Sequence, residues 1–159
     1  MASMRQTGYP AYSGGGRQTA RPESVPAGTV ARYVGALALL AMAAIHLQQY
    51  TASDYSQIPT IGTLFLLNFA GGVAVALALM SPLERLATGT GARLLVALAL
   101  VGATMAAVSI AFLLVSEHTT LFGFRETGYR PAIVLALISE GVAVLCLGGF
   151  AAGRLLGRR

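Results

Sequence analysis

Residues 131–147 read PAIVLALISEGVAVLCL, an apolar run of the kind that enters a lipid bilayer. One carboxylate, that of Glu140, lies close to the middle of this run. An acidic side chain at the centre of a bilayer costs roughly 2.5–3.5 kcal/mol on insertion scales. Polar groups on other segments must offset this cost, so the run predicts a helix that packs against partner helices within the membrane.

The composition of the whole chain is also that of a membrane protein. Of the 159 residues, 55% are hydrophobic and only 11% are charged, whereas a soluble domain carries about 25% charged residues. So small a polar fraction cannot cover a soluble globule, and the length suits one domain. All 11 basic residues are arginines that gather at segment ends, which indicates membrane topology and not nucleic-acid binding.

Four apolar segments are predicted to be transmembrane helices. Their expected spans are residues 33–50, 61–80, 93–116 and 131–152. Short connections between the spans favour an all-α integral membrane protein built as an antiparallel four-helix bundle over residues 28–159. Residues 1–27 are rich in Gly, Ser, Pro, Gln and Arg without an apolar period, so we expect a disordered cytoplasmic tail there.

Small residues at helical spacing mark the faces that we expect to pack. Gly71 and Gly72 are adjacent in the second span, and Gly102, Ala106 and Ser109 follow one face of the third. Such residues let helix backbones approach closely in a membrane. Packing within the chain and self-association both remain open.

The arginines are distributed unevenly between the two expected sides of the membrane. Nine lie before the first span, around the link between the second and third spans, or after the fourth span. Only Arg125 and Arg130 lie in the link between the third and fourth spans. The positive-inside rule therefore predicts a multi-pass plasma-membrane protein with both termini in the cytoplasm.

The strongly polar residues of the spans lie toward the outer side. Counted inward at ~1.5 Å per residue, His46, Asn68 and Glu140 lie about 6, 10 and 13 Å from the outer helix ends. The inner halves of the spans consist mainly of Ala, Leu, Val and Gly. This asymmetry predicts a binding pocket formed by Glu140, Asn68 and His46 that opens to the outer side.

Glu140 has two interpretations. It could carry a proton or bind a cation, which would make the chain a transporter subunit with Glu140 as the coupling carboxylate. Alternatively, it could be a protonated or hydrogen-bonded side chain that holds helices together, with the Asn68 amide as a donor.

The two histidines, His46 and His118, fall on the first and third spans. Imidazoles from facing helices can ligate haem b, so this pair is a candidate cofactor site. His118 could also bind a metal ion with the neighbouring Glu117. The alternative is that both histidines only form local hydrogen bonds near the membrane surface.

No catalytic motif is visible, since the chain has no GxSxG, P-loop, HExxH or CxxC sequence. We therefore expect a non-enzymatic accessory or binding protein of the plasma membrane. Its partners would be the lipid bilayer and a membrane protein or a second copy of the chain. The rival expectation is a bis-His membrane cytochrome or a metal-binding redox subunit.

Two segments, QIPTIGTLFLLNFAGG at 57–72 and LFGFRE at 121–126, resemble a group of small, uncharacterised four-helix membrane proteins of high-GC Gram-positive bacteria. The resemblance covers roughly residues 30–150. It implies the four-span topology and a plasma-membrane location, and it implies no activity and no site residue.

Overall fold

The computed structural model describes residues 26–52, 55–85, 89–123, 125, 128 and 130–157. The long helices are α1 (Ala27–Ala52), α2 (Pro59–Met80), α3 (Thr90–His118) and α4 (Pro131–Leu156), and two short 3-10 helices are η1 (Tyr55–Gln57) and η2 (Leu83–Arg85). The tail predicted over 1–27 lies outside the described residues except for its last two, of which Ala27 already begins α1.

Each long helix is long and apolar enough to cross a membrane, which confirms that the four apolar segments predicted from the sequence form helices of membrane-spanning length. The helices contain 22 to 29 residues, so even the shortest is about 33 Å long, against a hydrocarbon core of about 30 Å. Pro59 and Pro131 occupy the first turns of α2 and α4, where a proline lacks no hydrogen bond that the helix needs.

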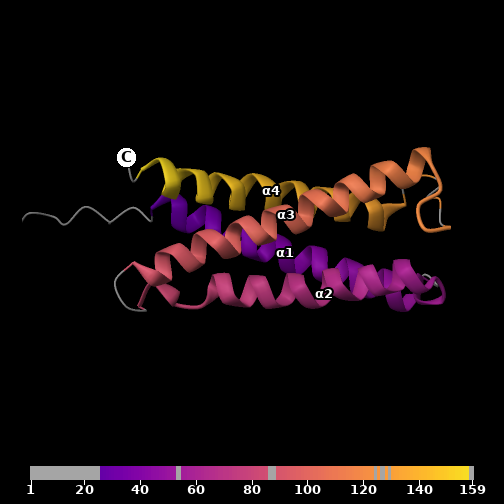
Figure 1. Ribbon diagram of the computed structural model, residues 1–159, viewed down its shortest axis with the longest axis horizontal. Helices are drawn as coiled ribbons and strands as arrows, with labels where there is room; N and C mark the ends of the chain where they lie inside the picture. The colour runs from indigo at the N-terminus through magenta and orange to yellow at the C-terminus, as the bar shows by residue number, and fades with distance from the viewer. Residues whose placement is uncertain are drawn as a thin grey trace, which may run out of the picture.

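The four helices lie side by side, and the start of α1 and the end of α4 lie at the same end of the bundle (Figure 1). A Cβ placed on Gly28 would lie 3.8 Å from the Phe150 ring, which confirms that these two ends meet. Helix α1 packs extensively against α2 and α4, and α3 packs against α4. Contact between α2 and α3 is much smaller, so these two helices leave the loosest seam of the bundle.

The apolar core occupies the half of the bundle nearest the start of α1. The largest of its side chains that are less than 2% exposed are Leu39, Met42, Leu79, Leu95 and Leu147. Alanines fill the space between them, as the Ala- and Leu-rich inner halves of the spans predict. This half is closely packed, which leaves the other half of the bundle to hold the polar residues.

Two of the glycines singled out in the sequence mark close approaches between helices of this chain. A Cβ on Gly102 would lie 2.7 Å from Leu39 and 2.9 Å from Leu147. A Cβ on Gly72 would lie 3.2 Å from the Cβ of Ala43. Both glycines therefore serve packing within the chain.

A buried cation ties α1 to the link before α3. Arg32 is only 3% exposed, and its guanidinium donates a hydrogen bond to the carboxylate of Glu84 in η2. The guanidinium carbon also lies 4.6 Å from the centre of the Tyr33 ring. The ion pair holds η2 against α1 at the end of the bundle where the chain's described ends meet.

Candidate functional site

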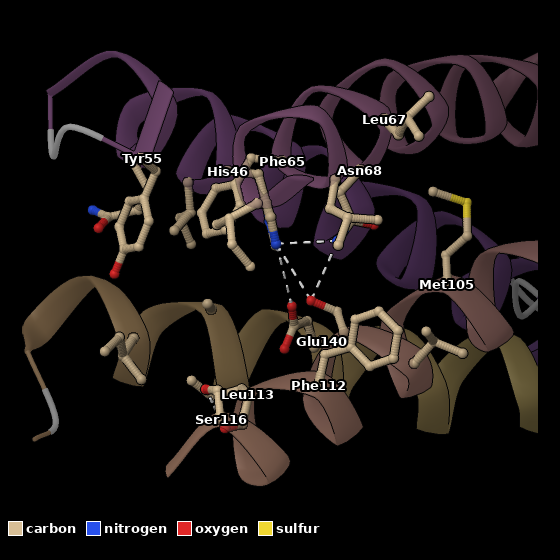
Figure 2. Close-up of a pocket in the computed structure, with 18 of the residues that line it drawn as sticks. His46, Tyr55, Phe65, Leu67, Asn68, Met105, Phe112, Leu113, Ser116 and Glu140 are labelled. Carbon is tan, nitrogen blue, oxygen red and sulfur yellow. Dashed lines mark hydrogen bonds and ion pairs between the residues drawn. The ribbon is translucent and has the colours of Figure 1, made fainter. Parts of the chain in front are cut away.

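A cavity of about 380 Å³ lies in the half of the bundle opposite the apolar core (Figure 2). All four long helices line it, together with Tyr55 of η1 and Leu121 of the link between α3 and α4. Its walls are mainly apolar side chains. The cavity is therefore an apolar chamber between helices, and its few polar groups stand out.

Four polar side chains, one from each long helix, converge at this cavity: His46, Asn68, Ser109 and Glu140. We call them the polar tetrad, and the dashed lines of Figure 2 connect them. The structure thus brings together the three residues predicted to form a pocket, and it adds Ser109 from the small-residue face of α3.

His46 makes contact with all three other members through Nε2. This atom lies 3.1 Å from Asn68 Nδ2, 3.3 Å from Ser109 Oγ and 3.9 Å from Glu140 Oε1. The Asn68 amide also donates to Ser109 Oγ at 3.3 Å. The imidazole is therefore the centre of the tetrad.

The other ring nitrogen fixes which tautomer His46 adopts. Its Nδ1 lies 2.9 Å from the carbonyl oxygen of Met42, one turn earlier on α1. Because a carbonyl oxygen can only accept, Nδ1 carries the hydrogen. In the neutral ring Nε2 is then an acceptor, and the Asn68 amide supplies the hydrogen bond.

Glu140 and His46 form a pair that is best occupied by one proton. Glu140 is only 1% exposed, and its carboxyl also contacts the Ser109 hydroxyl. If Glu140 were ionised beside a neutral His46, the carboxylate oxygen and the imidazole Nε2 would be two acceptors facing each other. The buried negative charge of the carboxylate would also have no countercharge. One proton on either group leaves the pair without net charge, which is the arrangement that burial favours.

Stacked aromatic rings cover the tetrad on the side of η1. The Phe65 ring lies between His46, at a centroid distance of 5.0 Å, and Tyr55, at 4.8 Å. Arg130, just before α4, donates to the Tyr55 hydroxyl. Tyr55 is only 5% exposed, so this end of the cavity is closed by packed side chains.

Gln49 lines the same cavity one turn beyond His46 on α1. It is only 7% exposed, and its Nε2 donates to Gln48 Oε1 at 2.7 Å. Its Oε1 is buried without a hydrogen-bond partner. Within the described part of the chain, Arg32 Nε at the far end of the bundle is the only other buried side-chain atom in this condition.

The cavity opens sideways between α2 and α3. Of its described lining residues, those that are largely exposed all lie on these two helices: Leu67, Thr104, Val108 and Phe112. Leu67 on α2 is 62% exposed and Val108 on α3 is 46% exposed. The opening therefore follows the loosest seam of the bundle, where lipid chains would surround the protein if the helices span a membrane.

The residues predicted to hold a cofactor are not brought together. His118 is the exposed last residue of α3, nine residues beyond Ser109 and therefore about 13 Å along the helix axis from the tetrad. Glu117 precedes it in the same turn. Where the chain is described, no three His, Cys, Asp or Glu side chains are placed to hold a metal ion. Haem or metal binding at His46 and His118 stays a prediction.

The helices and the cavity define a class, that of small helical proteins with a ligand-sized chamber among apolar, membrane-length helices. Comparison with protein-family models, with curated proteins and with solved structures finds no match to the chain. Its function must therefore be argued from the site itself.

Proposed function

We propose that this chain is a non-enzymatic binding protein of the plasma membrane whose cavity holds a small membrane-soluble molecule. The observation that carries the proposal is the polar tetrad in the wall of a mainly apolar chamber. Ligand sites in proteins commonly combine apolar walls with a few convergent polar groups, in volumes of roughly 300–1,000 Å³. The cavity of about 380 Å³ falls within that range.

The proposal places the cavity in the outer half of the membrane. In it, the chain spans the bilayer as an antiparallel four-helix bundle with both termini in the cytoplasm, and its plasma-membrane location follows the resemblance to small four-helix bacterial membrane proteins. The excess of arginine on the side of the termini supports this orientation. The tetrad lies in the half of the bundle away from that side.

The contrast between the two halves of the bundle supports binding over a purely structural role for the tetrad. Polar residues that only hold helices together need no space beside them, and protein interiors contain few voids larger than a water molecule. Here the core half is filled by leucine and alanine, whereas the half that holds the tetrad contains the cavity, which opens between α2 and α3. Space and polar groups therefore occur together.

A transporter subunit is the second candidate, and the His46–Glu140 pair favours it. Glu and His side chains that exchange a proton inside a membrane are recurrent elements of proton relays. In this candidate, loss of that proton would accompany the binding of a cation. The closing of the cavity toward η1 by Tyr55 and Phe65 would then have to be reversible.

Filling the cavity tests the binding function. Ala136 lines the cavity from α4, whereas Ala152, an exposed alanine near the end of the same helix, does not line it. We expect a small apolar molecule to be extracted from the purified wild type and from Ala152→Leu, and to be depleted in Ala136→Leu, as measured by mass spectrometry. Equal recovery of every extracted small molecule from the three proteins would contradict a ligand in this cavity.

A further inference from the structure

Asn68 presents a hydrogen-bond acceptor that the chain itself does not use. Its Nδ2 donates to His46 Nε2 at 3.1 Å and to Ser109 Oγ at 3.3 Å (Figure 2). Its Oδ1 has no hydrogen-bond partner among the described residues. Asn68 is half-buried, and this oxygen, unlike Gln49 Oε1, is not enclosed by protein atoms. Because Asn68 lines the cavity, the acceptor is open to a molecule that enters there.

The orientation of the Asn68 amide is fixed by His46. The hydrogen on Nδ1 of His46 bonds the Met42 carbonyl, so the neutral ring offers Nε2 as an acceptor. With the proton of the His46–Glu140 pair on Glu140, a flip of the amide would set Asn68 Oδ1 against Nε2, and two acceptors would face each other. The nitrogen of Asn68 therefore faces the tetrad, and its oxygen is left for a ligand.

A ligand that pairs with this acceptor must bring a donor hydrogen and few other polar groups. An unpaired acceptor is unfavourable in an apolar environment, and most of all where lipid replaces water. The described walls of the cavity are mainly apolar, so each further polar group on a ligand would need a partner of its own. A hydroxyl brings one donor hydrogen, whereas a primary amide or a carboxylic acid adds a carbonyl oxygen. A single hydroxyl therefore suits the site best.

The titratable groups of the cavity favour a ligand without charge. His46 on α1 and Glu140 on α4 are the only acidic or basic side chains among the described lining residues. One proton leaves this pair without net charge. An anion would therefore meet no countercharge, and a cation would have to displace the proton of the pair.

The mouth of the cavity favours a ligand with a hydrocarbon chain. Leu67 and Val108 are the exposed rim on α2 and α3, and Asn68 and Ser109 are half-buried on the same two helices. In the proposed orientation Asn68 lies about 10 Å inward from the outer end of its span, below the phospholipid headgroups. A polar group held at this depth belongs to an uncharged lipid, and its chain can run through the seam into the bilayer.

We propose that the cavity binds a neutral lipid alcohol, whose single hydroxyl donates a hydrogen bond to Asn68 Oδ1 and whose hydrocarbon chain passes between α2 and α3. This inference rests on the proposed binding function and names the ligand class of the same cavity. Binding is non-covalent and leaves the proton of the His46–Glu140 pair in place.

Binding can be followed with an introduced tryptophan, because the chain contains none. Leu67→Trp places the reporter at the rim of the cavity, and Leu145→Trp places a matched reporter on α4, where Leu145 is 77% exposed and does not line the cavity. The probes are decanol, its isomer nonyl methyl ether, which lacks an O–H group, and decylammonium. Each is added to the full-length protein in detergent at equal mole fraction in the micelle. The response of Leu145→Trp measures partition into the micelle and is subtracted.

We expect decanol to bind the Leu67→Trp protein about fivefold more tightly than the ether, because the ether has no hydrogen for Asn68 Oδ1. Decylammonium should bind more weakly than decanol, since it must displace the proton of the pair. Adding Asn68→Leu should abolish the preference for the alcohol over the ether. The matched change Thr63→Leu, at an exposed position of the same helix that does not line the cavity, should preserve it.

A second variant keeps the location testable if Asn68→Leu fails to fold. Ala136→Leu fills the cavity from α4 and should abolish the saturable response of the Leu67→Trp protein to decanol. A decanol response that persists in Ala136→Leu, or a preference for the alcohol that persists in Asn68→Leu, would contradict binding at this site.

Equal affinity for decanol and the ether would overturn the inference and leave the binding function standing. Tighter binding of decylammonium would overturn it too, and would indicate a cation at Glu140. Absence of a saturable response to every probe would also overturn it. In that case the recovery of an extracted molecule from wild type and its depletion in Ala136→Leu would show separately that the cavity has a different ligand. Failure of both experiments would remove the proposed function with the inference.

Discussion

Asn68 supplies the hydrogen that orients the tetrad, because its amide donates to both His46 and Ser109. We predict that Asn68→Leu lowers the free energy of unfolding by about 1–3 kcal/mol, since it leaves buried acceptors without a donor. Thermal unfolding in a fixed detergent measures the change. Thr63→Leu, at an exposed position of the same helix, is the control, and an equal effect of the two changes would contradict the prediction.

Glu140 distinguishes a binding protein from a transporter subunit. Glu140→Gln keeps the shape and the hydrogen-bonding capacity of the side chain but removes the exchangeable proton of the pair. We predict that this variant folds with a free energy of unfolding within about 1 kcal/mol of wild type and still yields the molecule that wild type yields on extraction. Unfolding and mass spectrometry of the extract provide the two measurements.

A different outcome for Glu140→Gln would favour the second candidate. If the variant folds and binds as wild type does but abolishes a pH-dependent ion flux that wild-type protein shows in vesicles, Glu140 is a coupling carboxylate. Ser139→Ala, at the preceding position of α4, is the control, because Ser139 bonds only its own helix at Ala136 among its described partners.

Single site residues were predictable from the sequence where a polar side chain interrupts an apolar segment at a position that can be counted from the helix end. Glu140, Asn68 and His46 are polar residues within apolar segments, so counting along each helix placed all three in the outer halves of the spans. Ser109 was assigned only to a packing face, and Gln49 was not singled out. Their roles depend on how each helix is rotated about its axis, and the three-residue spacing of His46 and Gln49 was the available signal.

At the scale of the helices, Gly102 shows how closely the elements approach. We predict that Gly102→Ala lowers the free energy of unfolding by about 1–3 kcal/mol, because the new Cβ would press on Leu39 and Leu147. Gly141→Ala is the matched control, since a Cβ there meets no described atom within 4 Å. The control should stabilise the helix by about 0.5–1 kcal/mol.

Thermal unfolding of both variants in the same detergent checks the sign of each effect. Destabilisation by Gly102→Ala with a neutral or stabilising Gly141→Ala would agree with close packing of α3 on α1 and α4. Equal effects of the two substitutions would mean that helix propensity, and not the approach of Leu39 and Leu147, decides the outcome.

The helices were predictable as elements, and their ends less so. Length and hydropathy predicted all four spans, and proline marked the starts of α2 and α4. Helix α1 begins at Ala27, six residues before the predicted span, because Gly28 to Arg32 continue the helix without an apolar pattern that would signal it. The burial of Arg32 against Glu84 depends on a contact between distant segments, which no local pattern indicates.

At the scale of the whole molecule, the cavity arises from unequal packing of the four helices. Close contacts of α1 with α2 and α4 fill the core half, while the loose seam between α2 and α3 leaves space beside the tetrad. The sequence predicted a pocket open to the outer side. In the structure Tyr55 and Phe65 stack at that end of the cavity, and the exposed lining residues lie on α2 and α3. An opening on the outer side stays a prediction.

We propose above all that the bundle spans the membrane with its polar cavity in the outer half, and labelling at the two ends of α3 tests this most directly. Thr90 and Thr119 are exposed and lie at the start of α3 and just beyond its end. Cys146, the single cysteine of the chain, is first replaced by alanine so that it cannot react. In this Cys146→Ala background, we predict that a membrane-impermeant maleimide labels Thr119→Cys in intact cells. We predict that it labels Thr90→Cys only after the membrane is permeabilised. Labelling of Thr90→Cys in intact cells would contradict the claim, whether or not Thr119→Cys also reacts.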